Sequence, residues 1–209
     1  TPLSSSAASD VYKRQTLTLK ETQIKLTKVN FDELPKPRKN KGVRGQLLEL
    51  ALGIPNSSKL TDMVDGELKS FTKGESIAVT QLRHVLPEII GHDFKLFKDS
   101  KVGIKLRNTL FVSFDRDNNY LGSTTLNAET HPEIYDMIEE DFEFIGEEIQ
   151  SRWLDDKELS TITGLNGLLQ IRTKDSKPYS PIYYEDVKLS NKGYAFYLTG
   201  KFGRIISVS

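Results

Sequence analysis

Apolar residues recur at helical spacing over one long stretch of the chain and form short runs elsewhere. The apolar positions of His131–Trp153 repeat every three to four residues, which predicts a long amphipathic helix with an acidic outer face. A second helix is predicted over Gly42–Leu52, because Gly53 and Pro55 would end it. Short apolar runs predict buried strands at Ile77–Leu82 and Thr109–Asp115, and the turn dipeptide Asp65-Gly66 predicts a short strand after it, at Glu67–Phe71. Later strands are predicted at Gly167–Thr173 and Tyr194–Leu198, and the loosely alternating Thr16–Leu26 is predicted as a strand or its remnant. Strands mixed with helices of this length favour an α/β or α+β domain.

Length and composition exclude several classes of protein. The chain has 209 residues, which is enough for one domain with a sizeable core. It has no cysteine, so disulfide scaffolds and thiolate zinc sites are excluded. The three histidines are not at metal-ligand spacing. No apolar run approaches the roughly 18–20 residues of a membrane span, and we expect a cytoplasmic, bacterial-type protein without a membrane partner.

The first fifteen residues do not have the sequence pattern of a folded segment. Ser5–Gln15 reads SSAASDVYKRQ, which resembles the in-frame translation of a sequencing-library adapter. It contains no apolar segment of the kind found in signal peptides. We therefore interpret residues 1–15 as an adapter-derived artefact and expect residues 16–209 to be a single domain truncated at its N-terminus.

The charges of the chain cancel in number but not in position. It has 29 acidic and 29 basic residues, yet Glu129–Glu158 contains 12 acidic and 2 basic ones. The rest of the chain is therefore strongly basic, and Thr161–Ser209 contains 7 basic and 3 acidic residues. This distribution suits binding of nucleic acid, with the acidic helix turned away from the phosphates.

One group of residues suggests metal-dependent chemistry. Glu67-Leu68-Lys69 follows Asp62 across a predicted turn. Positions i and i+2 of a strand face the same side, so Glu67 and Lys69 project together. If Asp62 lies beside them, two carboxylates and an ammonium meet, as metal-dependent phosphodiester hydrolysis requires. Mg²⁺ prefers oxygen ligands and often takes one or two carboxylates with phosphate and water, and a lysine can orient or deprotonate attacking water.

An acid-x-Lys triplet alone is a weak signal. Five further triplets begin at Asp93, Asp99, Asp155, Asp175 and Asp186. A surface hairpin with an ion pair is therefore the alternative interpretation. The upstream Asp62 and the strand character of the flanking residues distinguish the triplet at Glu67 from the others.

Three further segments carry candidate residues. Glu49 lies among leucines, so it either has a buried partner or points to solvent. Residues 101–107, KVGIKLR, are either functional or a solvated basic approach to the following strand. Arg172 and Lys174 share one side of a predicted strand, and arginine suits bidentate contacts to guanine or phosphate. An exposed basic edge strand is the alternative there.

Taken in order, these segments resemble the MutH family, which joins the methyl-directed mismatch-repair endonuclease to Sau-type restriction enzymes that cut GATC. The matching segments are KGVRGQLLELALG (41–53), SSKLTD…GELK (57–69), KVGIKLRNTLFV (101–112), EEDFE (139–143), LLQIRTK (168–174) and YAFYL (194–198). The resemblance implies a restriction-endonuclease-like core, in which helices flank a mixed sheet and a DNA cleft separates two lobes. It places a catalytic lobe at about residues 38–130 and a recognition lobe at about 155–209.

The resemblance also implies roles for individual residues. Asp62 and Glu67 match the Mg²⁺ ligands and Lys69 the water-activating lysine. Glu49 matches a helical glutamate that supports the metal site, and Lys105 a second lysine near the scissile phosphate. The positions that match contacts to the GATC site or its backbone are Arg172, Lys174 and Tyr197. Asp62 and Glu67 are five positions apart where the family has about seven, so Asp65 is an alternative first carboxylate.

The resemblance favours a Mg²⁺-dependent type II restriction endonuclease that cuts double-stranded DNA at or near GATC. Cleavage of both strands would use a homodimer on a palindromic site or two successive nicks. The alternative is a mismatch-repair nicking endonuclease that depends on an activator protein. An alternative of another class is a catalytically silent DNA-binding domain, against which the intact acidic and lysine positions argue.

Overall fold

The structure is a computed structural model that describes residues 17–37, 41–55, 59–174 and 179–206, so the adapter-like segment lies outside the described residues. The helices are α2 (Leu19–Leu26), α3 (Lys41–Leu52), α4 (Leu86–Ile89), α5 (Lys101–Leu106), α6 (Pro132–Leu154) and α7 (Gly200–Ile206), with short 3₁₀ turns η1 (Leu82–His84) and η2 (Phe97–Asp99). The strands are β1 (Glu67–Thr72), β2 (Ile77–Gln81), β3 (Asn108–Phe114), β4 (Tyr120–Asn127), β5 (Ile162–Thr163), β6 (Leu169–Thr173), β7 (Ile182–Tyr184), β8 (Val187–Ser190) and β9 (Tyr194–Leu198). Within these residues no helix is both long and apolar enough to cross a membrane.

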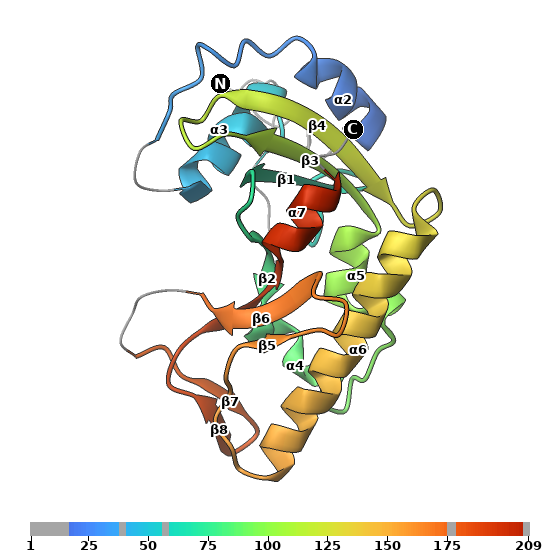
Figure 1. Ribbon diagram of the computed structural model, residues 1–209, viewed down its shortest axis with the longest axis vertical. Helices are drawn as coiled ribbons and strands as arrows, with labels where there is room; N and C mark the ends of the chain where they lie inside the picture. Colours follow the sequence, from blue (N-terminus) through green and yellow to red (C-terminus); the bar gives the residue numbers. More distant parts are fainter. Residues whose placement is uncertain (1–16, 38–40, 56–58, 175–178, 207–209) are drawn as a thin grey trace, which may run out of the picture.

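The strands form three sheets (Figure 1). The first has the order β1-β3-β4 and is mixed, because β1 is parallel to β3 and β3 is antiparallel to β4. The second has the order β2-β9-β6-β5 and is antiparallel throughout, and β7 and β8 pair as a separate hairpin. The chain is thus a mixed α and β protein, as predicted, but mixed pairing is confined to the three-stranded sheet.

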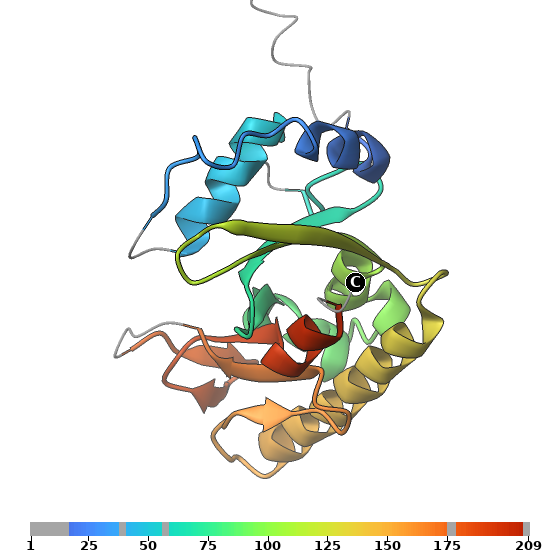
Figure 2. The same ribbon diagram turned by 45° about the horizontal axis from the view of Figure 1, so that its top comes forward.

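The three-stranded sheet has an apolar core on each face. Leu68, Leu110 and Val112 pack with residues of α2 and α3 on one face. Phe71 and Phe111 point to the other face, where they join the larger core of the protein. Helix α7 lies between the two main sheets (Figures 1 and 2), and its Phe202 ring is centred 5.3 Å from that of Phe111. Burial on both faces explains why β3 contains an apolar run.

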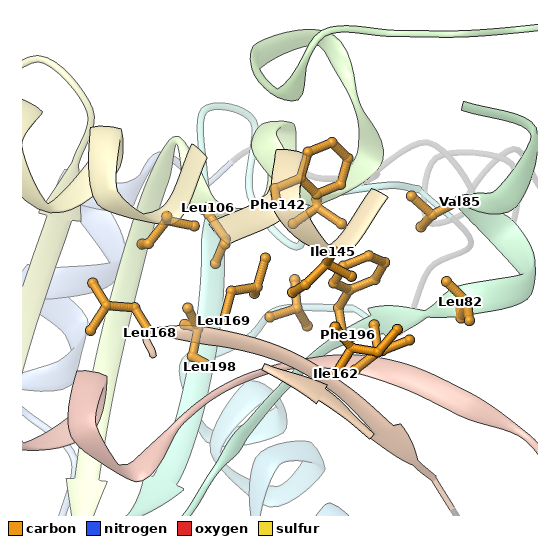
Figure 3. Packing of buried hydrophobic residues seen from close by; sticks show 14 of the residues in the cluster. Leu82, Val85, Leu106, Phe142, Ile145, Ile162, Leu168, Leu169, Phe196 and Leu198 are labelled. Atoms are coloured by element: carbon orange, nitrogen blue, oxygen red, sulfur yellow. The ribbon is translucent and has the colours of Figure 1, made fainter. Parts of the chain in front are cut away.

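Helix α6 covers the four-stranded sheet. It was predicted over His131–Trp153 and is observed over Pro132–Leu154, so this prediction is confirmed within one residue at each end. Its residues Phe142 and Ile145 face Phe196 and Leu198 of β9 across the core (Figure 3). The acidic residues of its outer face are exposed; they include Glu133, Asp136, Glu140, Glu143 and Glu147. The helical period of the apolar residues therefore corresponds to the buried face.

The prediction of a strand at Thr16–Leu26 is wrong, because this segment forms helix α2. Thr18 and Glu21 make a capping box, in which each side chain accepts a hydrogen bond from the other residue's backbone N–H, at 3.2 and 2.8 Å. Leu19, Thr22 and Leu26 are buried on one face at a helical spacing. In so short a segment, apolar residues that alternate as in a strand also fit the spacing of a helix. The capping box of Thr18 and Glu21 favours the helix.

Candidate active site

Four of the predicted residues meet at the beginning of β1. The Glu67 side chain, the first of the strand, is only 1% exposed, and its Oε1 accepts hydrogen bonds from two lysines. Lys69 Nζ lies 2.6 Å and Lys105 Nζ 2.8 Å from this oxygen. Helix α5 leads directly into β3, and the parallel register pairs Glu67 with Thr109. The pairing of β1 with β3 thus brings Lys105 to a carboxylate 38 positions earlier in the chain.

Asp62 completes this group through the turn before β1. Its Oδ2 accepts a hydrogen bond from the backbone N–H of Leu68 at 3.0 Å. Its own backbone N–H donates to Glu67 Oε2 at 3.2 Å. Asp65, the alternative first carboxylate, is turned elsewhere, because its Oδ1 accepts from the backbone N–H of Leu19 at the start of α2. The five-residue spacing therefore still places an aspartate beside Glu67, and that aspartate is Asp62.

Glu49 approaches the same group from helix α3. The side chain is half-buried, and burial, followed by the negative charge of Asp62, raises its pKa. Lys69 opposes this shift and Glu67 adds to it. Burial also raises the pKa of Asp62, with a second contribution from the charge of Glu67. Three carboxylates and two lysines thus interact within one site, which we call the carboxylate–lysine cluster (Glu49, Asp62, Glu67, Lys69 and Lys105).

Arg44 anchors the helix that carries Glu49, and sequence reasoning missed its role. Its side chain is buried, and Nη1 donates to Thr72 Oγ1 at 3.1 Å and to Asn118 Oδ1 at 3.0 Å. Its guanidinium also lies 4.6 Å from the centre of the Phe114 ring. These contacts tie α3 to the end of β1 and to the turn after β3. The sequence signal that could have indicated this role is an arginine among the apolar residues of a predicted helix, because a buried arginine needs partners for its charge.

The cluster suits a divalent cation held by two carboxylates. Within the described ranges, no three His, Cys, Asp or Glu side chains are grouped as a ready-made cage. Asp62 and Glu67 nevertheless lie close enough that the charge of Glu67 raises the pKa of Asp62, a repulsion that a bound cation would relieve. Mg²⁺ commonly uses one or two carboxylates and takes its other ligands from phosphate and water. Asp62 and Glu67 would hold the ion here.

Replacing Asp62 with asparagine is expected to raise the melting temperature slightly at neutral pH without divalent cations. A carboxyl group whose pKa is raised on folding stabilises the fold below its unfolded pKa, and this stabilisation is lost as the pH rises through the folded pKa. Asp62 is such a group, chiefly because it is buried. The gain of Asp62→Asn should therefore be present at neutral pH and disappear in acid, as thermal denaturation in EDTA would measure.

The same variant separates metal binding from electrostatics. Adding Mg²⁺ should raise the melting temperature of the unsubstituted chain, since a ligand of the folded state stabilises it. It should raise that of Asp62→Asn much less. Asp117→Asn, at an exposed position in the turn after β3, is the matched control. A gain of Asp62→Asn that persists in acid would show that repulsion and burial of the carboxylate are not its cause.

The predicted recognition residues form a second group on the four-stranded sheet. Arg172 on β6 lies with its guanidinium 4.4 Å from the centre of the Tyr197 ring on β9. Leu169 and Ile171 of β6 are buried in the core, so strand alternation places Arg172 on the opposite face. The Nε of Arg172 has no hydrogen-bond partner in the described part of the chain. Lys174 follows the end of β6 and is exposed.

The two groups belong to different sheets. The carboxylate–lysine cluster belongs to the three-stranded sheet, whereas Arg172 and Tyr197 belong to the four-stranded one. The sheets are joined by the short turn between β1 and β2. A scan of the chain against models of protein families matches none, and a search of curated proteins finds no similar sequence.

Proposed function

We propose that this chain is a Mg²⁺-dependent, sequence-specific DNA endonuclease of the type II restriction class, acting at or near GATC. The observation that carries the proposal is the convergence of Asp62, Glu67, Lys69 and Lys105 on one buried point. Two acidic groups and two ammonium groups at one strand end suit the hydrolysis of a phosphodiester. The order of the motifs and their resemblance to the MutH family supply the choice of DNA and of GATC.

In this proposal Asp62 and Glu67 bind Mg²⁺, which would polarise a phosphate oxygen and a bound water. Lys69 orients the attacking water through its ammonium group or, after losing a proton to solvent, accepts one from that water. Lys105 offsets the negative charge that grows on the phosphate oxygens as the water oxygen bonds to phosphorus. The phosphorus–oxygen ester bond then breaks, and the leaving oxygen takes up a proton. Because both lysines contact Glu67, a phosphate bound to an ion held by Asp62 and Glu67 would lie beside them.

Recognition is assigned to the other sheet. On the face of the four-stranded sheet opposite Leu169 and Ile171, the partly exposed Arg172 lies against the Tyr197 ring, and the exposed Lys174 follows the end of β6. Stacking on an aromatic ring holds a guanidinium in one orientation, which favours bidentate contacts to a guanine edge or a phosphate. Cleavage of both strands would then follow from a homodimer on the palindrome or from two successive nicks.

The test is cleavage of supercoiled plasmid with Mg²⁺, on DNA with and without adenine methylation at GATC. We expect linear products from unmethylated plasmid and none in EDTA. Weak nicking that grows only with a mismatch-repair activator would move the assignment to the nicking endonuclease. Tight, salt-sensitive binding of GATC without any cleavage would identify a silent DNA-binding domain and refute the catalytic assignment.

A further inference from the structure

The antiparallel sheet brings two basic segments to one edge. Strands β2 and β6 flank β9 and both run antiparallel to it, so both leave the sheet where β9 begins. At this edge Gln81 pairs with Ala195, and the backbone N–H of Lys174 donates to Gly193 O at 2.8 Å. Arg83 and His84 follow directly after β2 in the turn η1. Segments far apart in the sequence thus meet at one end of the sheet.

Helix α5 connects this edge to the carboxylate–lysine cluster. Lys101 Nζ donates to the backbone oxygen of His84 at 2.7 Å. Lys101 and Lys105 are four residues apart on the same helix, so they lie one turn apart on one face. Lys105 in turn contacts Glu67 of the cluster. A row of cations therefore runs from the candidate catalytic carboxylates to the edge where β2 and β6 end.

The charges at this edge are close together and only partly neutralised. The pKa of His84 is lowered, first by burial and then by the positive charges of Arg83, Lys101 and Lys174. Glu88 is the carboxylate in contact here, and its Oε1 lies 3.1 Å from Lys101 Nζ. Arg83 and Lys174 are exposed, and neither forms an ion pair with a carboxylate in the described ranges. Uncompensated like charges that lie together are unfavourable unless an anion binds them.

We propose that Arg83, His84 and Lys101, together with Lys174, form a phosphate-binding surface for the backbone of duplex DNA. We call these four residues the basic edge. The occupant follows from the arrangement of the charges: a row of separate lysine and arginine cations that begins at the catalytic cluster fits a strand of repeated phosphates rather than a single anion. His84, whose pKa is lowered, adds an imidazole that can form a hydrogen bond rather than a further charge. The inference rests on the proposed function, because it gives the duplex a path from the reacting phosphate to the sheet that carries Arg172.

The test compares Arg83→Gln with Lys188→Gln. Lys188 is an exposed lysine of β8, so its replacement removes one charge elsewhere. Affinity for a fluorescent duplex without GATC is measured in EDTA over a range of salt concentrations. Removing one cation that binds a phosphate should reduce the slope of log K against log salt by about 0.9. We expect a reduction of this size and a several-fold weaker affinity for Arg83→Gln, with no change for Lys188→Gln.

Two results would overturn the basic edge. Equal salt slopes for Arg83→Gln and Lys188→Gln would show that Arg83 contacts no phosphate. Weaker binding of inorganic phosphate by Arg83→Gln, with unchanged affinity for the duplex, would show a small-anion site instead. Melting temperatures of the variants exclude loss of fold. The two proposals can fail separately. Plasmid cleavage tests the proposed function, whereas the salt dependence of binding in EDTA tests the basic edge and requires no cleavage.

Discussion

Replacing Lys69 with methionine is expected to slow Mg²⁺-dependent DNA cleavage by about 10²–10⁴-fold, the usual contribution of a positioned proton-transfer group. Methionine keeps most of the length and the apolar stem of lysine but lacks the ammonium that lies 2.6 Å from Glu67 Oε1. Glu67 keeps Lys105 as a partner at 2.8 Å, so the buried carboxylate is not left unpaired. The fold should therefore persist while the water loses its proton acceptor or guide.

The rate is measured on supercoiled plasmid with enzyme in excess, so that binding and product release do not limit it. Lys73→Met is the matched control, because Lys73 lies just beyond the same strand and is exposed. Affinity for duplex DNA in EDTA should be similar in both variants. Where Lys73→Met cleaves DNA, cleavage by Lys69→Met at a similar rate would exclude Lys69 from the chemistry.

Replacing Asp141 with alanine is expected to lower the free energy of unfolding by about 3 kcal/mol or more, since three backbone donors would lose their acceptor and each buried donor left unsatisfied costs about 1–3 kcal/mol. Asp141 lies on the inner face of α6 and is fully buried. Its carboxylate accepts backbone N–H groups of Asn166 at 2.5 Å, Leu168 at 2.7 Å and Leu169 at 2.8 Å. It thereby fixes the β5–β6 turn, and with it the strand that carries Arg172.

Urea denaturation followed by circular dichroism measures this decrease in stability. Asp136→Ala is the matched control, because Asp136 is an exposed acidic residue of the same helix. It should change the free energy of unfolding by less than about 0.5 kcal/mol. A decrease below about 1 kcal/mol in Asp141→Ala would mean that the three backbone groups find other partners, and that the turn does not depend on this carboxylate.

The charge pattern of α6 illustrates what sequence could and could not separate. The 12 acidic residues of Glu129–Glu158, most of them in this helix, predicted a solvated acidic face, and that face is exposed. Asp141 is one of these residues and is nevertheless buried, because the turn after β5 presents three N–H groups to it. Glu88 is a comparable case: it is buried beside two lysines, Lys95 and Lys101. The sequence shows that these residues are negatively charged, but it does not show which groups their carboxylates contact in the folded protein.

The sequence by itself determined the elements with a long or strongly apolar pattern. The extent of α6, the helix α3 and the strands β3 and β9 follow from residues close in the chain, since period and local stop signals specify them, and the Asp65-Gly66 turn marks the start of β1. The sequence also brought Glu67 and Lys69 to one side of a strand, because side chains two positions apart in a strand share a face. These features needed no knowledge of what packs against them.

Only the tertiary structure decided which candidates share a site. Lys105 reaches Glu67 because β1 and β3 pair in parallel, and Asp62 rather than Asp65 lies beside it because Asp65 binds the start of α2. Strand pairing also separates the strands into two main sheets. It brings Arg83, which follows β2, to the same edge of the four-stranded sheet as Lys174, which follows β6. Such contacts join residues tens of positions apart, and a local pattern carries no record of the strand order that creates them.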